Sequence, residues 1–257
     1  MAADSWFSVT FPAVTNDDKL DDKLIGPPWG VADFFLVMIA GIAGAFAAGA
    51  VVIGLGLGAG PAVAVSALGM SAGHAVGLSV AKNRRSANLA HLGLVVEPED
   101  GRYLLLGAIL QVVLAVVFSP IAKLVDSDGT TQVVADQIAG ITDLGLRIAI
   151  ILLVGLVAPV MEELAFRGVL LSAARRRLGD RAAIAVTALV FSLFHWLGVD
   201  QGNALAGVLT LVQLFLTGLV LGHLAVKHER LGPAIFLHAG FNMLTLMVLF
   251  FAPEALG

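Results

Sequence analysis

The sequence predicts an all-α, polytopic membrane helix bundle with about seven transmembrane helices, and two observations carry this prediction. Of the 257 residues, 58% are hydrophobic and only 13% are charged, with a mean hydropathy of +0.94, whereas soluble domains carry about 25% charged residues. Apolar runs of 18 or more residues also recur along most of the chain, and a run of this length is a candidate membrane helix.

Seven apolar segments are expected to cross the bilayer. The predicted spans are Val31–Leu57, Pro61–Ala81, Tyr103–Leu124, Leu144–Ala174, Ala182–Trp196, Ala204–Val226 and Pro233–Phe251. The fourth is too long for one straight span, and we expect Pro159 to kink it because proline removes a backbone hydrogen bond and clashes with the preceding turn. The chain then divides into a cytoplasmic segment (1–30), N-terminal transmembrane helices and loops (31–142) and a C-terminal transmembrane core (143–251).

The N-terminal segments have a simple composition. The first thirty residues are acidic ("NDDKLDDK") and lack the basic leader of a signal peptide. The first two spans are rich in glycine and alanine ("GIAGAFAAGA"). Small residues let helix backbones approach closely, and we interpret them as intramolecular packing rather than as a dimer face.

The distribution of basic residues predicts the orientation. Lysine and arginine gather in the loops after the second, fourth and sixth spans, namely Lys82, Arg84, Arg85, Arg102, Arg175, Arg176, Arg177, Arg181, Lys227 and Arg230. Cytoplasmic loops carry an excess of basic residues. The N-terminus is therefore expected in the cytoplasm and the C-terminus outside.

Composition also restricts the chemistry. The chain has no cysteine, which excludes disulfides, thiol catalysis and thiolate metal sites. The net charge of −4 gives no indication of a nucleic-acid partner, and we predict none. The protein is expected to lie in a lipid bilayer.

Polar and ionisable side chains inside the spans are the candidates for function, because burying them in hydrocarbon is costly. They concentrate in the fourth, fifth and seventh spans, as Glu162, Glu163, Arg167, His195, His238 and Asn242. Counting at 1.5 Å per residue from the basic turn "RRRLGD", the two glutamates and His195 each lie roughly 20 Å deep. A helical hairpin at this turn would bring them to one level.

The spacing of these residues predicts that they face one another. Glu163 and Arg167 are four residues apart, as are His238 and Asn242 and also Phe191 and His195, and residues four apart share a helix face. Glu163 and Arg167 suit a supporting ion pair. His74, which stands alone in the second span, is interpreted as a structural histidine bonded to a neighbouring carbonyl.

Peptide hydrolysis is the chemistry that this set could perform. A carboxylate in a low-dielectric site can act as general base on water, a histidine can share that water or protonate the leaving amine, and a second histidine with an asparagine amide can stabilise the oxyanion. Alternatively, Glu162, His195 and His238 could hold a divalent metal such as Zn²⁺. The HExxH signature of zinc proteases is absent, and the residues leave open whether a cofactor is needed.

Three motifs resemble those of the CPBP family, intramembrane proteases related to the CAAX prenyl endopeptidase of eukaryotes and to bacterial Abi proteins. "EELAFRG" is similar to its EExxxR element, "FSLFH" to FxxxH and "HAGFN" to HxxxN. The resemblance implies that Glu162 activates water beside His195, that His238 and Asn242 stabilise the oxyanion, and that Glu163, Arg167 and Phe191 support them.

The resemblance further implies an intramembrane endopeptidase of glutamate or metal type, in a bacterial-type plasma membrane, with a cavity open toward the cytoplasm. Its substrate would be a membrane-associated protein or peptide. Two alternatives remain from the sequence. One is a non-catalytic bacteriocin-immunity or scaffold protein that binds a peptide partner. The other is a transporter, which is disfavoured because no inverted repeat of the polar half is found.

Overall fold

The computed structural model describes residues 29–124, 138, 140–199 and 203–252, and this part of the chain is helical without a β-strand. Its elements are α1 (Val31–Gly54), α2 (Ala59–Arg85), η1 (Leu89–Leu92), η2 (Pro98–Gly101), α3 (Arg102–Leu124), α5 (Leu144–Leu152), η3 (Leu153–Val157), α6 (Ala158–Glu163), η4 (Leu164–Leu171), α7 (Ser172–Leu178), α8 (Asp180–Phe194), η5 (Trp196–Gly198), α9 (Ala204–His228) and α10 (Gly232–Phe251). The predicted all-α class is confirmed. The predicted boundary at 142/143 stays a prediction, and residues 1–28 lie outside the described part.

Six helices of the described chain are long and apolar enough to cross a membrane, one fewer than predicted. The remaining segment, predicted as Ala182–Trp196, is α8, which has 15 residues and a length of about 22 Å. A span needs about 20 residues. The helix ends at Phe194, and after His195 the chain tightens into the 3₁₀ turn η5.

The fourth predicted span forms one continuous helical path of 35 residues, Leu144–Leu178, built from α5 to α7. Two stretches of it, η3 and η4, are π-helical. η3 ends at Val157, and Pro159 is the second residue of the α-helix that follows, α6. The kink expected at Pro159 therefore appears as the π-helical stretch η3. The second π-helical stretch, η4, was not predicted.

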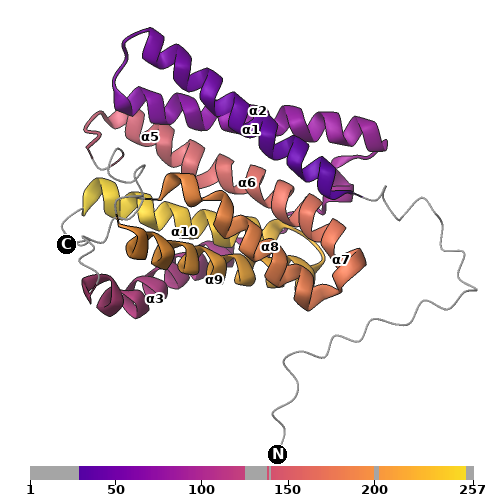
Figure 1. Cartoon of the computed structure of the whole chain (residues 1–257). Helices are drawn as coiled ribbons and strands as arrows, with labels where there is room; N and C mark the ends of the chain where they lie inside the picture. The colour runs from indigo at the N-terminus through magenta and orange to yellow at the C-terminus, as the bar shows by residue number, and fades with distance from the viewer. Residues whose placement is uncertain (1–28, 125–137, 139, 200–202, 253–257) are drawn as a thin grey trace, which may run out of the picture.

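The long α5–α7 helix lies between two groups of helices (Figure 1). The α1–α2 hairpin packs on one side, where α1 contacts η4 and α2 contacts α5 and α6. On the other side α8 contacts η4 and α10 contacts α6, while α3 packs against α10. This arrangement encloses η4, all eight residues of which are buried.

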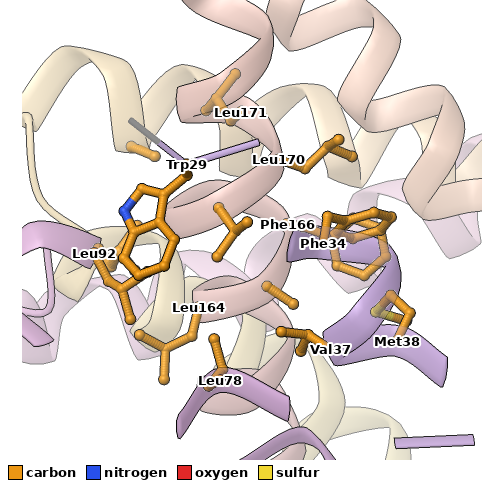
Figure 2. Close-up of a cluster of buried hydrophobic side chains, with 14 of the residues drawn as sticks. Trp29, Phe34, Val37, Met38, Leu78, Leu92, Leu164, Phe166, Leu170 and Leu171 are labelled. Carbon is orange, nitrogen blue, oxygen red and sulfur yellow. The ribbon is translucent and has the colours of Figure 1, made fainter. Parts of the chain in front are cut away.

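A cluster of apolar side chains fastens the hairpin to the long helix (Figure 2). Phe34 of α1 and Phe166 of η4 meet edge to face with ring centroids 5.0 Å apart, and Phe166 meets Phe191 of α8 at 5.1 Å. Val37 and Leu78 complete the contact from α1 and α2. Since lipid is as apolar as these side chains, close packing rather than exclusion of water holds the cluster together.

Glycines bring α1 and α2 into backbone contact. A Cβ on Gly69 would overlap the Gly44 carbonyl, and a Cβ on Gly73 would overlap the Ala40 carbonyl. The interpretation of these small residues as intramolecular packing is confirmed.

The three basic loops meet at one end of the bundle. Arg176 donates a hydrogen bond to the Trp29 carbonyl, the Trp29 indole donates to the His91 carbonyl, and the Leu231 amide donates to the Gly93 carbonyl. Ion pairs reinforce this end, as Arg85–Asp33, Arg175–Asp180 and Arg230–Glu97, each 2.7 Å long. A hydrogen bond with the Asp100 carboxylate raises the pKa of Arg230. The bundle therefore has one strongly basic end.

We predict that this basic end faces the cytoplasm. Two single cysteines in the cysteine-free chain test the prediction. Leu178→Cys replaces a side chain that is 50% exposed at the basic end, and Gly58→Cys lies at the opposite end, where a Cβ meets nothing within 4 Å. A membrane-impermeant maleimide added to intact cells should label Gly58→Cys and spare Leu178→Cys. The reverse pattern would overturn the orientation.

Candidate active site

The predicted site residues come from three neighbouring segments of the bundle. Glu162 and Glu163 end α6, between the two π-helical stretches, and Arg167 follows within η4. α8 supplies Phe191 and ends immediately before His195, while α10 supplies His238 and Asn242. α8 packs against η4, and α10 packs against α6. The polar residues of the three motifs therefore lie in one region of the bundle.

A buried ion pair forms the centre of this region. The Arg167 Nη1 donates to Glu163 Oε1 at 2.8 Å, and neither side chain has any solvent exposure. Arg167 also donates through Nη2 to the Gly218 carbonyl of α9 at 3.1 Å. The guanidinium lies 4.7 Å from the centre of the Phe191 ring, within the range of a cation–π contact. The structure thus contains the ion pair that the i,i+4 spacing predicts, and links it to α8 and α9.

His238 connects the ion pair to the second glutamate. Its Nδ1 lies 3.0 Å from Glu163 Oε1, and its Nε2 lies 3.7 Å from Glu162 Oε2. An ionised carboxylate paired with arginine can only accept hydrogen bonds. Nδ1 of His238 therefore carries a proton and donates a hydrogen bond to Glu163. This bond fixes the ring and directs Nε2 toward Glu162.

Glu162 differs from its neighbour in its surroundings. Its side chain is 18% exposed, against 0% for Glu163. Its Oε2 lies farther from Nε2 of His238 than in a direct hydrogen bond. Glu162 is therefore the carboxylate of this site that a reactant can reach.

Phe191 contacts both His195 and His238. The His195 Nδ1 bonds with the carbonyl of Phe191 at 2.8 Å, and the two rings are 4.7 Å apart. The Phe191 ring also contacts the ring of His238, and these two ring centres are 5.7 Å apart. Because Nδ1 of His195 faces a carbonyl oxygen, it is the donor, and Nε2 is left for a reactant.

Asn242 is held by a carbonyl that Pro159 leaves free. In the π register the Ala158 amide bonds to the Leu153 carbonyl, five residues earlier. The next acceptor, the carbonyl of Val154, would pair with residue 159, which is a proline and has no N–H. The Asn242 side-chain amide donates to this carbonyl at 3.1 Å. One amide proton of Asn242 is thereby used for positioning, and the other remains to donate elsewhere.

The arrangement was also tested against a bound metal. A zinc site needs three protein ligands that converge on one point. In the described ranges no group of three His, Cys, Asp or Glu side chains is arranged to hold a metal ion. Of the three candidate ligands, Glu162 and His238 form a close pair, while His195 is joined to them through Phe191. The donor set does not fit a preformed zinc site.

These features define a membrane protein with a buried glutamate–histidine site. Residues 144–244 match the family described as Type II CAAX prenyl endopeptidase Rce1-like. This segment is therefore similar to a Rce1-like endopeptidase domain, and the resemblance found in the three motifs is confirmed. The matched segment contains all of the predicted site residues. Comparisons with curated proteins and with solved structures gave no match.

Sequence reasoning missed three contacts at the site. The bond from His238 to Glu163, the bond from Arg167 to the Gly218 carbonyl and the bond from Asn242 to Val154 all join residues more than fifty positions apart. A signal for the last was present, because Pro159 leaves a carbonyl without its usual donor. The other two bonds, from His238 to Glu163 and from Arg167 to the Gly218 carbonyl, have no local sequence pattern that would predict them.

Removing Arg167 should destabilise the protein as well as inactivate it. Arg167→Ala leaves the Glu163 carboxylate buried without its cation, and breaking a buried pair in this way costs about 3–5 kcal/mol. We expect a large fall in the melting temperature in detergent. Arg177→Ala, which removes an exposed arginine at the end of α7, is the matched control and should melt like the parent. Equal melting of Arg167→Ala and the control would show that the pair does not stabilise the fold.

Proposed function

We propose that the protein is an intramembrane endopeptidase that hydrolyses a peptide bond of a membrane-associated protein or peptide, with Glu162 as the base that activates water. One observation carries the proposal. Glu162, partly exposed, lies 3.7 Å from Nε2 of a histidine whose other nitrogen is bonded to a fully buried glutamate. Such an orientation of a reactive pair by a third group is typical of catalytic sites.

The proposed reaction begins with a water molecule bonded to Glu162. The carboxylate takes a proton from the water, and the water oxygen forms a bond to the carbonyl carbon of the substrate. The carbonyl oxygen then bears the negative charge. His238, when protonated on Nε2, and the free amide proton of Asn242 donate to this oxyanion.

Collapse of the intermediate completes the hydrolysis. The bond between carbon and nitrogen breaks, and the leaving nitrogen receives the proton held by Glu162, a transfer in which we assign His195 a share. The products are a new carboxyl group and a new amine. In the oxyanion step Glu162 is protonated and neutral. The negative charges of Glu163 and the oxyanion are then balanced by the Arg167 guanidinium and a protonated His238, which suits a low-dielectric interior.

We propose that these residues suffice without a metal, because their arrangement supports a water-activating pair better than a three-ligand site. The location of the site supports the choice of substrate. Glu162 lies within a helical path of 35 residues in a bundle of membrane-spanning helices, so a substrate has to approach within or beside the bilayer.

Glu162→Gln tests the base directly. The change keeps the size of the side chain and removes its basicity, so turnover of a fluorescence-quenched peptide should fall by about 10²-fold or more, while the melting temperature stays near that of the parent. Glu99→Gln, at an exposed glutamate in η2, should leave both unchanged. Turnover retained by Glu162→Gln would eliminate Glu162 as the base.

The histidines test whether the protein is an enzyme or a binding protein. Groups that act as one catalytic unit are not additive when removed, so His195→Gln and His238→Gln should each abolish most activity and the double variant should be little worse. Asn242→Ala should cost on the order of 10²–10³-fold, as for one oxyanion donor.

Two results would contradict this assignment. A folded double variant that retained the cellular phenotype of the parent would indicate an immunity or scaffold protein. Loss of a bound metal from either single histidine variant, measured by elemental analysis of the purified protein, would assign the histidines to a metal site.

A further inference from the structure

Ser192 of α8 is a buried polar side chain that the proposed mechanism does not use. The residue is 2% exposed, and its hydroxyl donates a hydrogen bond of 2.6 Å to the Leu211 carbonyl of α9. Other hydroxyls of the described helices bond along their own helix, to the carbonyl four residues earlier, as do Ser71, Thr187, Thr210, Thr217 and Thr245. Ser192 instead joins two helices, and its position in α8 indicates why.

Ser192 lies in the last turn of α8, where the helix needs a fastening. The helix ends at Phe194, and helix ends fray. Earlier in α8 close packing holds it to α9, because a Cβ on Gly218 would meet Ala188 at 3.0 Å and a Cβ on Gly222 would meet Ile184 at 3.1 Å. The Ser192 bond extends the contact between α8 and α9 to the last turn.

The backbone of this last turn holds the His195 ring. The His195 backbone amide donates to the Ser192 carbonyl, three residues earlier, at 3.0 Å. In a continued α-helix it would donate to the Phe191 carbonyl. That carbonyl is instead bonded to Nδ1 of the His195 ring at 2.8 Å. A shift of the last turn would therefore carry the imidazole with it.

We propose that Ser192 is a positioning residue for His195. Its bond to the Leu211 carbonyl fixes the last turn of α8 against α9, and the carbonyls of that turn fix the imidazole. The same helix, α9, supplies the Gly218 carbonyl that accepts a hydrogen bond from Arg167. α9 is thus bonded both to the buried ion pair and to the turn that bears His195. The inference rests on the proposed role of His195 in the reaction.

Ser192→Ala removes the bond between the helices with little change in size. The Leu211 carbonyl lies within α9 and keeps its partner in that helix. Because one hydrogen bond between membrane helices contributes little to stability, the melting temperature should stay near that of the parent. We expect kcat on a fluorescence-quenched peptide to fall roughly 10- to 100-fold with little change in KM, as a small misplacement of a catalytic group does.

Thr187→Val is the matched control. Thr187 carries a buried hydroxyl on the same helix, 1% exposed, which bonds to the Ala183 and Ile184 carbonyls of α8 itself. The change removes this hydroxyl and keeps the shape of the side chain, so kcat should equal that of the parent. Ser192→Cys keeps a weak donor of similar size, and its kcat should lie between those of Ser192→Ala and the parent.

The position of the ring can be measured without an activity assay, by ¹⁵N NMR of histidine-labelled protein in detergent micelles. The His195 signals are assigned by their loss in His195→Gln. In Ser192→Ala these signals should shift, and the Nδ1 proton should exchange faster with water, because its bond to the Phe191 carbonyl is weakened. In Thr187→Val both should remain as in the parent.

A Ser192→Ala protein that kept either the kcat or the His195 signals of the parent would overturn the inference. An equal fall in kcat in Ser192→Ala and Thr187→Val, or a fall matched by loss of folded protein, would also overturn it, since either result would assign Ser192 to packing. Glu162→Gln, measured in parallel, tests the proposed function separately. If Glu162→Gln remains active, that proposal fails, while the His195 signals in Ser192→Ala still decide whether Ser192 positions the ring.

Discussion

The ion pair between Glu163 and Arg167 is the interaction on which the rest of the site depends. Both side chains are fully buried within a bundle of apolar helices, where an unpaired charge would be strongly destabilising. Their remaining bonds extend outward, from Arg167 to the Gly218 carbonyl and from Glu163 to His238. The pair thereby ties the long helix to α9 and α10, and it sets the ring of His238 beside Glu162. Glu163 is fully buried in this pair and stabilises the fold, whereas its neighbour Glu162 stays partly exposed and can meet a reactant.

Much of this arrangement could be predicted from the sequence. The apolar runs predict a membrane bundle because few other folds tolerate such a composition. The spacing of Glu163 and Arg167 predicts their pair, since residues four apart meet on a helix. Pro159 marks the place where the helical register changes, and the basic loops that were expected on one side meet at one end of the bundle.

Other features have no local signature. α8 has the composition of a span, but its length depends on where the chain turns at His195. The packing of the His74 ring against Gly41 joins residues of two different helices. The bond between His238 and Glu163 joins residues 75 positions apart. Periodicity describes one helix at a time, whereas these contacts are set by how several helices pack.

The most direct measurement is the protonation of His238 by ¹⁵N NMR of histidine-labelled protein in detergent micelles, with the His238→Gln variant used to assign the signal. Glu163 can orient His238 in this way only if Nδ1 of His238 carries a proton, because Nδ1 then donates a hydrogen bond to a buried carboxylate. We predict a protonated Nδ1 signal that shifts when Glu163 is changed to glutamine. An unprotonated Nδ1 in the folded parent protein would contradict this role of the ion pair, since Glu163 would then not orient the histidine that faces Glu162.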